Sequence, residues 1–206
     1  MQLGSHAHGV YVHVPFCAKR CDYCAFATYT DRHHLTSTYL DALRTDIRRS
    51  VETGMPLATS VFIGGGTPPM VPADELMAVL GEISLAPHAE VTVECNPDNI
   101  TLDMMRTYRD GGVNRVSIGV QSTAPHVLTA LGRTHDPENI QRSVQAVRQA
   151  GFNSFNLDII YGAAGETLED WRKTVEDVVA LDPPHVSAYG LTVEANTPLA
   201  SQPHRH

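Results

Sequence analysis

Six short runs rich in β-branched and aromatic residues alternate with stretches of helical periodicity along this 206-residue chain. Several of the runs are almost continuously apolar, which is typical of parallel strands covered on both faces. The runs are VYVHV from Val10, SVFIG from Ser60, EVTVE from Glu90, RVSIGV from Arg115, SFNLDII from Ser154 and HVSAYGL from His185. Strands and helices in alternation predict an α/β fold with a parallel sheet, either an open doubly wound sheet or an incomplete barrel. Both arrangements bring ligands to the carboxyl ends of the strands.

Three apolar stripes at helical spacing predict amphipathic helices between the strands. They run from Leu35 to Val51, from Ile140 to Gly151 and from Leu168 to Val178, and the simplest interpretation of each is packing against the core. Helix starts are expected at Pro72, Pro125 and Pro137.

Composition indicates one ordinary globular domain, with 42% hydrophobic and 18% charged residues. We expect a disordered N-terminus over residues 1–9, a core domain over 10–200 and a polar tail over 201–206. A net charge of -8 argues against a nucleic-acid binder. The start MQLGSHAHG lacks the features of a signal peptide and no apolar run would span a membrane, so a cytoplasmic protein without disulfides is expected.

Three cysteines lie in the segment PFCAKRCDYC directly after the first strand: Cys17, Cys21 and Cys24. Thiolates at these spacings can converge from one loop on an iron–sulfur cluster, and three of them leave one iron without a protein ligand. Zinc with His13 as a fourth ligand is an alternative, although structural zinc sites usually pair their cysteines closely. Unligated thiols are another alternative. Cys95 is assigned no role: most lone cysteines of this kind simply pack, and a fourth cluster ligand is the remaining possibility.

The loop CAKRCDYC resembles the signature of the radical S-adenosylmethionine (radical SAM) superfamily. That resemblance implies a partial (β/α)6 TIM-like barrel that holds a 4Fe–4S cluster and S-adenosylmethionine. In the superfamily the cofactor chelates the open iron, and an electron from the cluster cleaves its sulfonium. Seven further segments are similar, in the same order, to the coproporphyrinogen dehydrogenase-like branch. They are YVHVPFC, FIGGGTP, VECNP, NRVSIGVQS, LGRTH, FNLDIIYG and HVSAYGLTVE.

Phe26 distinguishes two groups within that branch. The oxygen-independent coproporphyrinogen III oxidases carry a further cysteine at this position, whereas phenylalanine resembles the HemW-type heme chaperones. The resemblance therefore implies a chaperone that transfers heme to an acceptor protein. The alternative is radical oxidative decarboxylation of coproporphyrinogen III to protoporphyrinogen IX. Neither interpretation identifies the electron donor or the heme acceptor.

The end of the sequence carries a further expectation. Family members continue past the barrel into a C-terminal domain that is expected to hold the heme-binding histidine motif. That part of the family architecture is absent from these residues, so a truncated core without delivery function is a third interpretation.

Several residues at strand ends are candidates for cofactor contacts. Glu94, Gln121 and Asp158 each close a β-run, so their side chains should meet at one rim and accept from hydroxyl or ammonium groups. A helix cap or surface charge is the simpler alternative for each acid. The glycines at 64–66, before Thr67, let the backbone approach a ligand closely, although tight βα loops often need glycine anyway.

The resemblance implies S-adenosylmethionine contacts at a wider set of positions. They are Tyr11, Tyr23, Gly65, Gly66, Thr67, Glu94, Gln121, Arg133, Asp158 and Thr192. Tyr23 would lie against the adenine or shield the cluster from water. Arg133 would pair with a carboxylate, against the simpler interpretation of a solvent-exposed loop arginine. His135 has no assigned role, and exposed polar positions are expected for His33, His34, His88, His126, His204 and His206.

Overall fold

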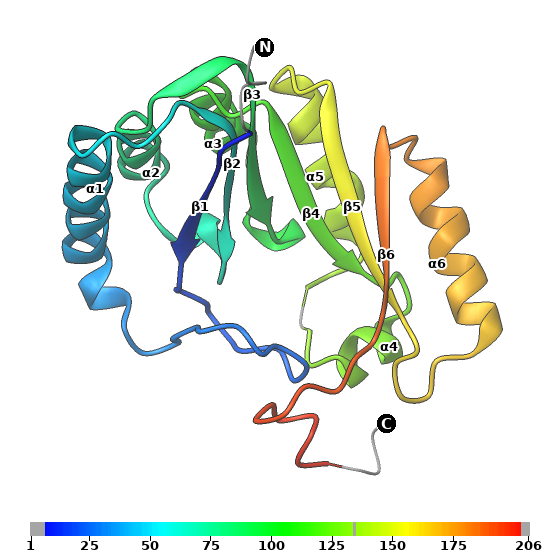
Figure 1. Cartoon of the computed structure of the whole chain (residues 1–206). Coiled ribbons are helices and arrows are strands. Elements are labelled where there is room, and N and C mark those ends of the chain that lie inside the picture. Colours follow the sequence, from blue (N-terminus) through cyan, green and yellow to red (C-terminus); the bar gives the residue numbers. More distant parts are fainter. Residues whose placement is uncertain (1–6, 134, 203–206) are drawn as a thin grey trace, which may run out of the picture.

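The chain forms a six-stranded parallel sheet in a computed structural model that describes residues 7–133 and 135–202 (Figure 1). The strands follow one another in sequence order, β1-β2-β3-β4-β5-β6, and the two outer strands do not pair to close a barrel within these residues. Their bounds are Gly9–Val14, Ala58–Gly65, Leu85–Cys95, Arg115–Gln121, Ser154–Tyr161 and His185–Gly190. The predicted α/β fold with a partial, open barrel is confirmed.

Helices connect the strands, and all three expected helix starts are confirmed. Pro72 and Pro137 are the N-cap residues of α2 and α5, and Pro125 is the first residue of α4. Proline suits these positions because the first helical N–H groups have no intrahelical acceptor. The helices are α1 Thr36–Glu52, α2 Ala73–Leu80, α3 Leu102–Asp110, α4 Pro125–Ala130, α5 Glu138–Gln149 and α6 Leu168–Ala180, with short 3-10 turns η1 His33–Leu35, η2 Pro68–Met70 and η3 Pro97–Asn99.

The long helices lie outside the curved sheet and cover one face rather than the two expected (Figure 1). Alternate strand residues such as Val93, Ile118 and Leu157 point to these helices and form the hydrophobic core. The intervening residues face the concave side, where Ser117 and Asn156 are buried polar groups. This polar inner face distinguishes the sheet from an apolar packed layer.

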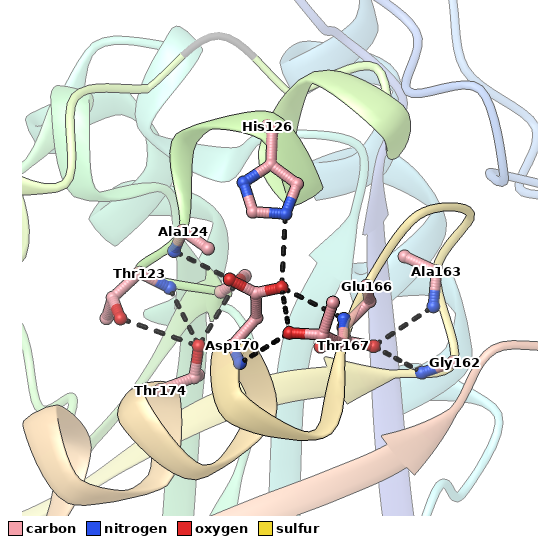
Figure 2. A network of polar contacts seen from close by, with 10 residues as sticks. Thr123, Ala124, His126, Gly162, Ala163, Glu166, Thr167, Asp170 and Thr174 are labelled. Atoms are coloured by element: carbon pink, nitrogen blue, oxygen red, sulfur yellow. Dashed lines mark hydrogen bonds and ion pairs between the residues drawn. The ribbon is translucent and has the colours of Figure 1, made fainter.

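Polar contacts fix the loops that follow β4 and β5 (Figure 2). The Glu166 carboxylate accepts the backbone N–H groups of Gly162 at 2.6 Å and Ala163 at 3.1 Å. The Asp170 carboxylate accepts from the His126 ring at 3.2 Å, which ties α6 to α4. Loops held in this way can present strand-end residues in defined positions.

The described chain begins within the segment expected to be disordered. Strand β1 starts at Gly9, and the backbone N–H of Thr59 donates to the His8 carbonyl at 2.8 Å. The rest of the predicted terminal segments, residues 1–6 and 203–206, lies outside the described residues. None of the helices in the described ranges has the length and apolar character needed to cross a bilayer.

Candidate cofactor site

A cavity of about 150 Å³ lies at the carboxyl ends of the strands, beneath the loop that follows β1. Cys17, Cys21 and Cys24 all line it, together with Phe26. The structure brings eight further predicted residues to the same walls: Tyr23, Gly65, Gly66, Thr67, Glu94, Gln121, Arg133 and Asp158. Residues far apart in the sequence therefore form one pocket around the three thiols.

Side chains hold the cysteine loop by its backbone carbonyls. The ring Nε2 of His13 donates to the Ala27 carbonyl at 2.8 Å, and the ring Nε2 of His33 donates to the Cys17 carbonyl at 3.1 Å. Arg20 donates twice to the Cys24 carbonyl, at 3.1 and 2.9 Å. Carbonyls only accept, so these three side chains fix the loop through their N–H groups.

His13 and His33 therefore differ from the expectations for them. The second ring nitrogen of His13, Nδ1, lies 3.1 Å from the Tyr11 hydroxyl, so both nitrogens are engaged. This geometry disfavours His13 as the fourth ligand of a zinc site. His33 is half-buried beside Phe16 rather than an exposed polar residue, because it packs under the loop that it holds.

The three thiols lie in different hydrogen-bonding environments. Thr67 Oγ1 donates to Cys17 Sγ at 3.6 Å, Arg133 Nη1 donates to Cys21 Sγ at 3.6 Å, and the Phe26 backbone bonds to Cys24. Burial raises the pKa of Cys17, and the Thr67 hydroxyl opposes this rise. Burial also raises the pKa of Cys24, against the Phe26 backbone bond. Hydrogen-bond donors directed at the sulfur atoms suit thiolates that bind a metal centre, because such thiolates are negatively charged.

Within the described residues, no three His, Cys, Asp or Glu side chains converge as the ligands of a single metal ion would. A 4Fe–4S cluster differs from such a site because each thiolate binds its own iron. All four cysteines are free thiols. Three separate thiols at one open cavity fit the donor set of a cluster with one iron left open.

Cys95 borders the cavity, but its side chain belongs to the hydrophobic core. It alternates with Glu94 along β3, so the two side chains leave opposite faces of the sheet. Burial raises the pKa of the Cys95 thiol strongly. Cys95 therefore packs in the core, as most lone cysteines do, and its position disfavours it as a fourth cluster ligand.

The glycines after β2 allow unusually close packing beside the cysteine loop. Gly65 has φ +105°, a conformation that side chains rarely adopt, and a Cβ there would collide with the His13 ring. A Cβ on Gly66 would lie 2.6 Å from the Val14 carbonyl oxygen and 2.7 Å from that of Phe16. The backbone of these glycines thus forms a cavity wall that no larger residue could replace.

Two carboxylates occupy the inner rim. Glu94 accepts the Gly65 N–H at 3.1 Å, and Asp158 accepts from Ser117 Oγ at 2.6 Å and from Asn156 Nδ2 at 2.7 Å. Burial raises the pKa of Glu94, the Gly65 N–H lowers it and the nearby Asp158 raises it further. Neither acid is a helix cap or a surface charge, because both line the cavity. They are acceptors held ready for hydroxyl or ammonium groups.

Gln121 and Tyr23 complete the walls in different ways. Gln121 is buried with φ +63°, next to a register shift between β4 and β5, so local backbone strain turns its side chain into the cavity. Tyr23 packs on a second apolar cluster that includes Val127 and Leu131, and burial raises its pKa. This packing is compatible with either role expected for the ring.

Two predicted contacts lie outside the cavity walls. Tyr11 is half-exposed and reaches only the edge, where its hydroxyl meets His13. Thr192 is exposed in the segment after β6 and does not line the cavity. Asn96 lines the cavity, although the sequence alone did not identify it as a site residue. Its position directly after the end of β3 could have indicated this.

Comparisons with known proteins agree with this geometry. The sequence profile of the Radical SAM superfamily matches residues 11–178. The heme chaperone HemW of Mycobacterium tuberculosis (strain CDC 1551 / Oshkosh) is 39% identical over 205 residues, which cover 96% of this chain and 53% of that protein. The heme chaperone HemW of Escherichia coli (strain K12) is 35% identical, covering 94% and 53%.

The solved structures include the coproporphyrinogen III oxidase HemN from Escherichia coli, a radical SAM enzyme. It superimposes with a TM-score of 0.84 at 31% identity, over 96% of this chain and 47% of that protein. The chain spans about half the length of the curated relatives that it matches. Since the superfamily profile covers most of the sequence, the chain belongs to the radical SAM superfamily.

Proposed function

We propose that the chain binds a 4Fe–4S cluster through Cys17, Cys21 and Cys24 and binds S-adenosylmethionine beside it. The observation that carries this proposal is the single cavity that all three thiols line. When bound, the cluster supplies the electron for reductive cleavage of the cofactor's sulfonium. The four free thiols suit a reducing cytoplasmic location.

The residues around the thiols supply the contacts that S-adenosylmethionine needs. The backbone of Gly65 and Gly66 can approach its methionine end closely. Glu94 and Asp158 offer carboxylate oxygens to an ammonium group or to ribose hydroxyls. Tyr23 offers a flat ring to the adenine. Gln121, Thr67 and Arg133 complete the proposed site, while Tyr11 and Thr192 have weaker support because they do not line the cavity.

We further propose that this is the cofactor-binding part of a heme chaperone that delivers heme to an acceptor protein. Phe26 supports this function, because it stands where the oxidase group has cysteine and is 62% exposed at the cavity. The relatives named heme chaperone HemW, at 35–39% identity, support it as well. The structural likeness to HemN keeps coproporphyrinogen III decarboxylation as the second candidate.

The cluster is tested by anaerobic reconstitution with iron and sulfide, followed by reduction and low-temperature electron paramagnetic resonance. A 4Fe–4S signal that shifts on addition of S-adenosylmethionine is the expected result. A folded protein with stoichiometric zinc and no cluster signal would contradict the proposal.

The choice between chaperone and oxidase needs two assays on the same cluster-loaded protein. Reduced heme should produce a saturable change in the heme absorption spectrum, and coproporphyrinogen III should remain unconverted. Formation of protoporphyrinogen IX with consumption of S-adenosylmethionine would establish the oxidase instead. Absence of heme uptake would remove the chaperone function from these 206 residues.

A further inference from the structure

A single carboxamide connects the surroundings of two cysteines in the cavity. Asn96 follows the last residue of β3 and lies between Thr67 and Arg133. Its Nδ2 donates to Thr67 Oγ1 at 3.3 Å, and its Oδ1 accepts from Arg133 Nη2 at 2.9 Å. Both groups of the amide are therefore used, one on each side.

Both hydrogen-bond partners of Asn96 also donate a hydrogen bond to a cysteine sulfur. Thr67 Oγ1 donates to Cys17 Sγ and Arg133 Nη1 donates to Cys21 Sγ, each at 3.6 Å. The result is a continuous path, Cys17–Thr67–Asn96–Arg133–Cys21, which we call the Asn96 bridge. It joins the ends of β2 and β3 and the loop after α4 to the cysteine loop.

The direction of each hydrogen bond in the Asn96 bridge is fixed. Arginine has no acceptor, so the oxygen of the amide must face Arg133 and its nitrogen must face Thr67. The Thr67 oxygen accepts this N–H, and its own hydrogen is then directed to Cys17. Hydrogen bonds in such a chain polarise one another, so the run Arg133–Asn96–Thr67 strengthens the donor to Cys17, while the contact between Asn96 and Arg133 orients the guanidinium toward Cys21.

The charge of Arg133 supports the same conclusion. No carboxylate lies within ion-pair distance of this guanidinium anywhere in residues 7–133 and 135–202. Its other contacts are neutral: His135 Nδ1 at 3.4 Å and the Gly119 carbonyl at 2.9 Å. The guanidinium is half-buried, and its Nη1 is directed at Cys21 Sγ, where a cysteine bound to a cluster would carry negative charge.

We propose that Asn96 is a positioning residue that holds Thr67 and Arg133 against two cluster cysteines and thereby sets the reduction potential of the cluster. The inference rests on the proposed function, because only a bound cluster has this potential. Donors to cluster sulfur stabilise the more negative, reduced state and so raise the potential. Loss of the bridge should lower it.

Asn96→Leu removes both amide contacts while keeping the number and branching of the side-chain heavy atoms. After equal loading, verified by iron and sulfide content, the midpoint is measured by redox titration with paramagnetic resonance. At a potential fixed near the wild-type midpoint, the ratio of reduced to oxidised cluster should fall about tenfold. For a one-electron couple this corresponds to a midpoint potential about 59 mV lower. The control is Asn99→Leu, three residues away in η3, because Asn99 has no side-chain hydrogen bond to any described residue.

A double variant distinguishes a bridge from a general structural effect. Thr67→Val breaks the bridge at another point, so adding it to Asn96→Leu should shift the potential less than the sum of the two single shifts. Thr67→Ser keeps the hydroxyl and should retain the wild-type potential. Independent shifts that add fully would overturn the inference.

The metal-free protein provides a second readout that does not need cluster uptake. Urea unfolding gives the loss of stability of each variant relative to the wild type. The loss in the double variant should again be smaller than the sum of the losses in the two single variants. If the wild type forms a cluster and Asn96→Leu leaves its potential unchanged, this inference fails and the proposed function stands. If the wild type forms no cluster, both fail, whatever the urea midpoints show.

Discussion

At the scale of single residues, the cavity depends on contacts that leave no room for added atoms. Gly66 lies between the cysteine loop and the turn after β2, and its N–H donates to the Val14 carbonyl at 2.8 Å. Its neighbours there are backbone atoms, which cannot rotate away as a side chain can. The fit of the cysteine loop to the sheet is therefore fixed by main chain rather than by side-chain packing.

Gly66→Ala should lower the free energy of unfolding by about 1–3 kcal/mol, because the new Cβ forces the loop away from β2. It should also reduce cluster uptake. Urea unfolding of the metal-free protein measures the first effect. Gly81→Ala is the matched control, since its nearest neighbours would lie at an ordinary 3.5 Å, and a similar loss there would show that the close contact is not the cause.

His135 should make the folded protein sensitive to mild acid. The ring is 7% exposed, and burial together with Arg133 lowers its pKa to about 4, while Asp98, Asp136 and a bond to the Val120 backbone oppose this shift. The unfolded chain, with a histidine pKa near 6.5, binds more protons between pH 6.5 and 4, so stability falls as pH falls through that window. The loss from pH 7 to pH 5 should be about 2 kcal/mol.

The measurement is urea unfolding of metal-free protein at several pH values, for the wild type and for His135→Gln. The variant should lose less stability between pH 7 and pH 5. Parallel pH profiles would show that the acid sensitivity comes from other groups.

The residue types of the site were predictable from the sequence to different degrees. Cys17, Cys21 and Cys24 are recognisable because three thiols at short spacing in one loop are typical of a metal centre. Asn96 and His33 were not, because asparagine before proline suggests a turn and a histidine without ligand spacing suggests a surface position. Their roles depend on which strands become neighbours, and sequence spacing does not contain that information.

At the scale of elements, α6 begins with a capping box that also serves the loop before it (Figure 2). The Thr167 hydroxyl accepts the Asp170 N–H at 3.1 Å, and the Asp170 carboxylate accepts the Thr167 N–H at 2.9 Å. The same carboxylate accepts from His126 on α4. One residue pair thus starts the helix and connects it to a neighbouring element.

Thr167→Ala should cost about 1 kcal/mol of stability, because an orphan helix N–H loses its acceptor. Thermal or urea unfolding measures this loss. Thr45→Ala is the control: Thr45 lies inside α1 and donates only to the Asp41 carbonyl, so alanine there should be neutral or slightly stabilising. Equal losses in both variants would exclude the cap as the cause.

The positions of the elements followed from apolar spacing, and the polarity of the sheet did not. Runs such as SFNLDII read as buried strands, yet Asn156 and Asp158 within it face the concave side. The burial of Asn156 is tolerated because its Nδ2 donates to Ser117 and its Oδ1 accepts from Ser187. Such pairing between strands appears only once the register is known.

At the scale of the whole molecule, the sheet ends in an unpaired strand. Strand β6 pairs only with β5 in the described part of the chain, and Tyr189 on it is 53% exposed. An edge of this kind offers free backbone groups and apolar surface to another copy. If two copies associate through this edge, Tyr189→Lys should weaken that association about tenfold, or about 1.4 kcal/mol.

Sedimentation velocity over a range of protein concentrations tests this expectation. Tyr29→Lys, at a similarly exposed tyrosine of the cysteine loop, should leave association unchanged. Equal effects of both substitutions would point to overall charge rather than the β6 edge.

Strand order has a consequence for how the protein is made. The ribosome synthesises the cysteine loop before the rest of the cavity, and Arg133 and Asp158 follow only after three further strands. At translation rates of about 5–20 residues per second, Cys21 waits roughly 5–20 s for the guanidinium that contacts it. A nascent chain therefore carries the three cysteines that we propose as cluster ligands well before the groups that surround them. The cavity around the cysteines can therefore be completed only after β5 has been synthesised.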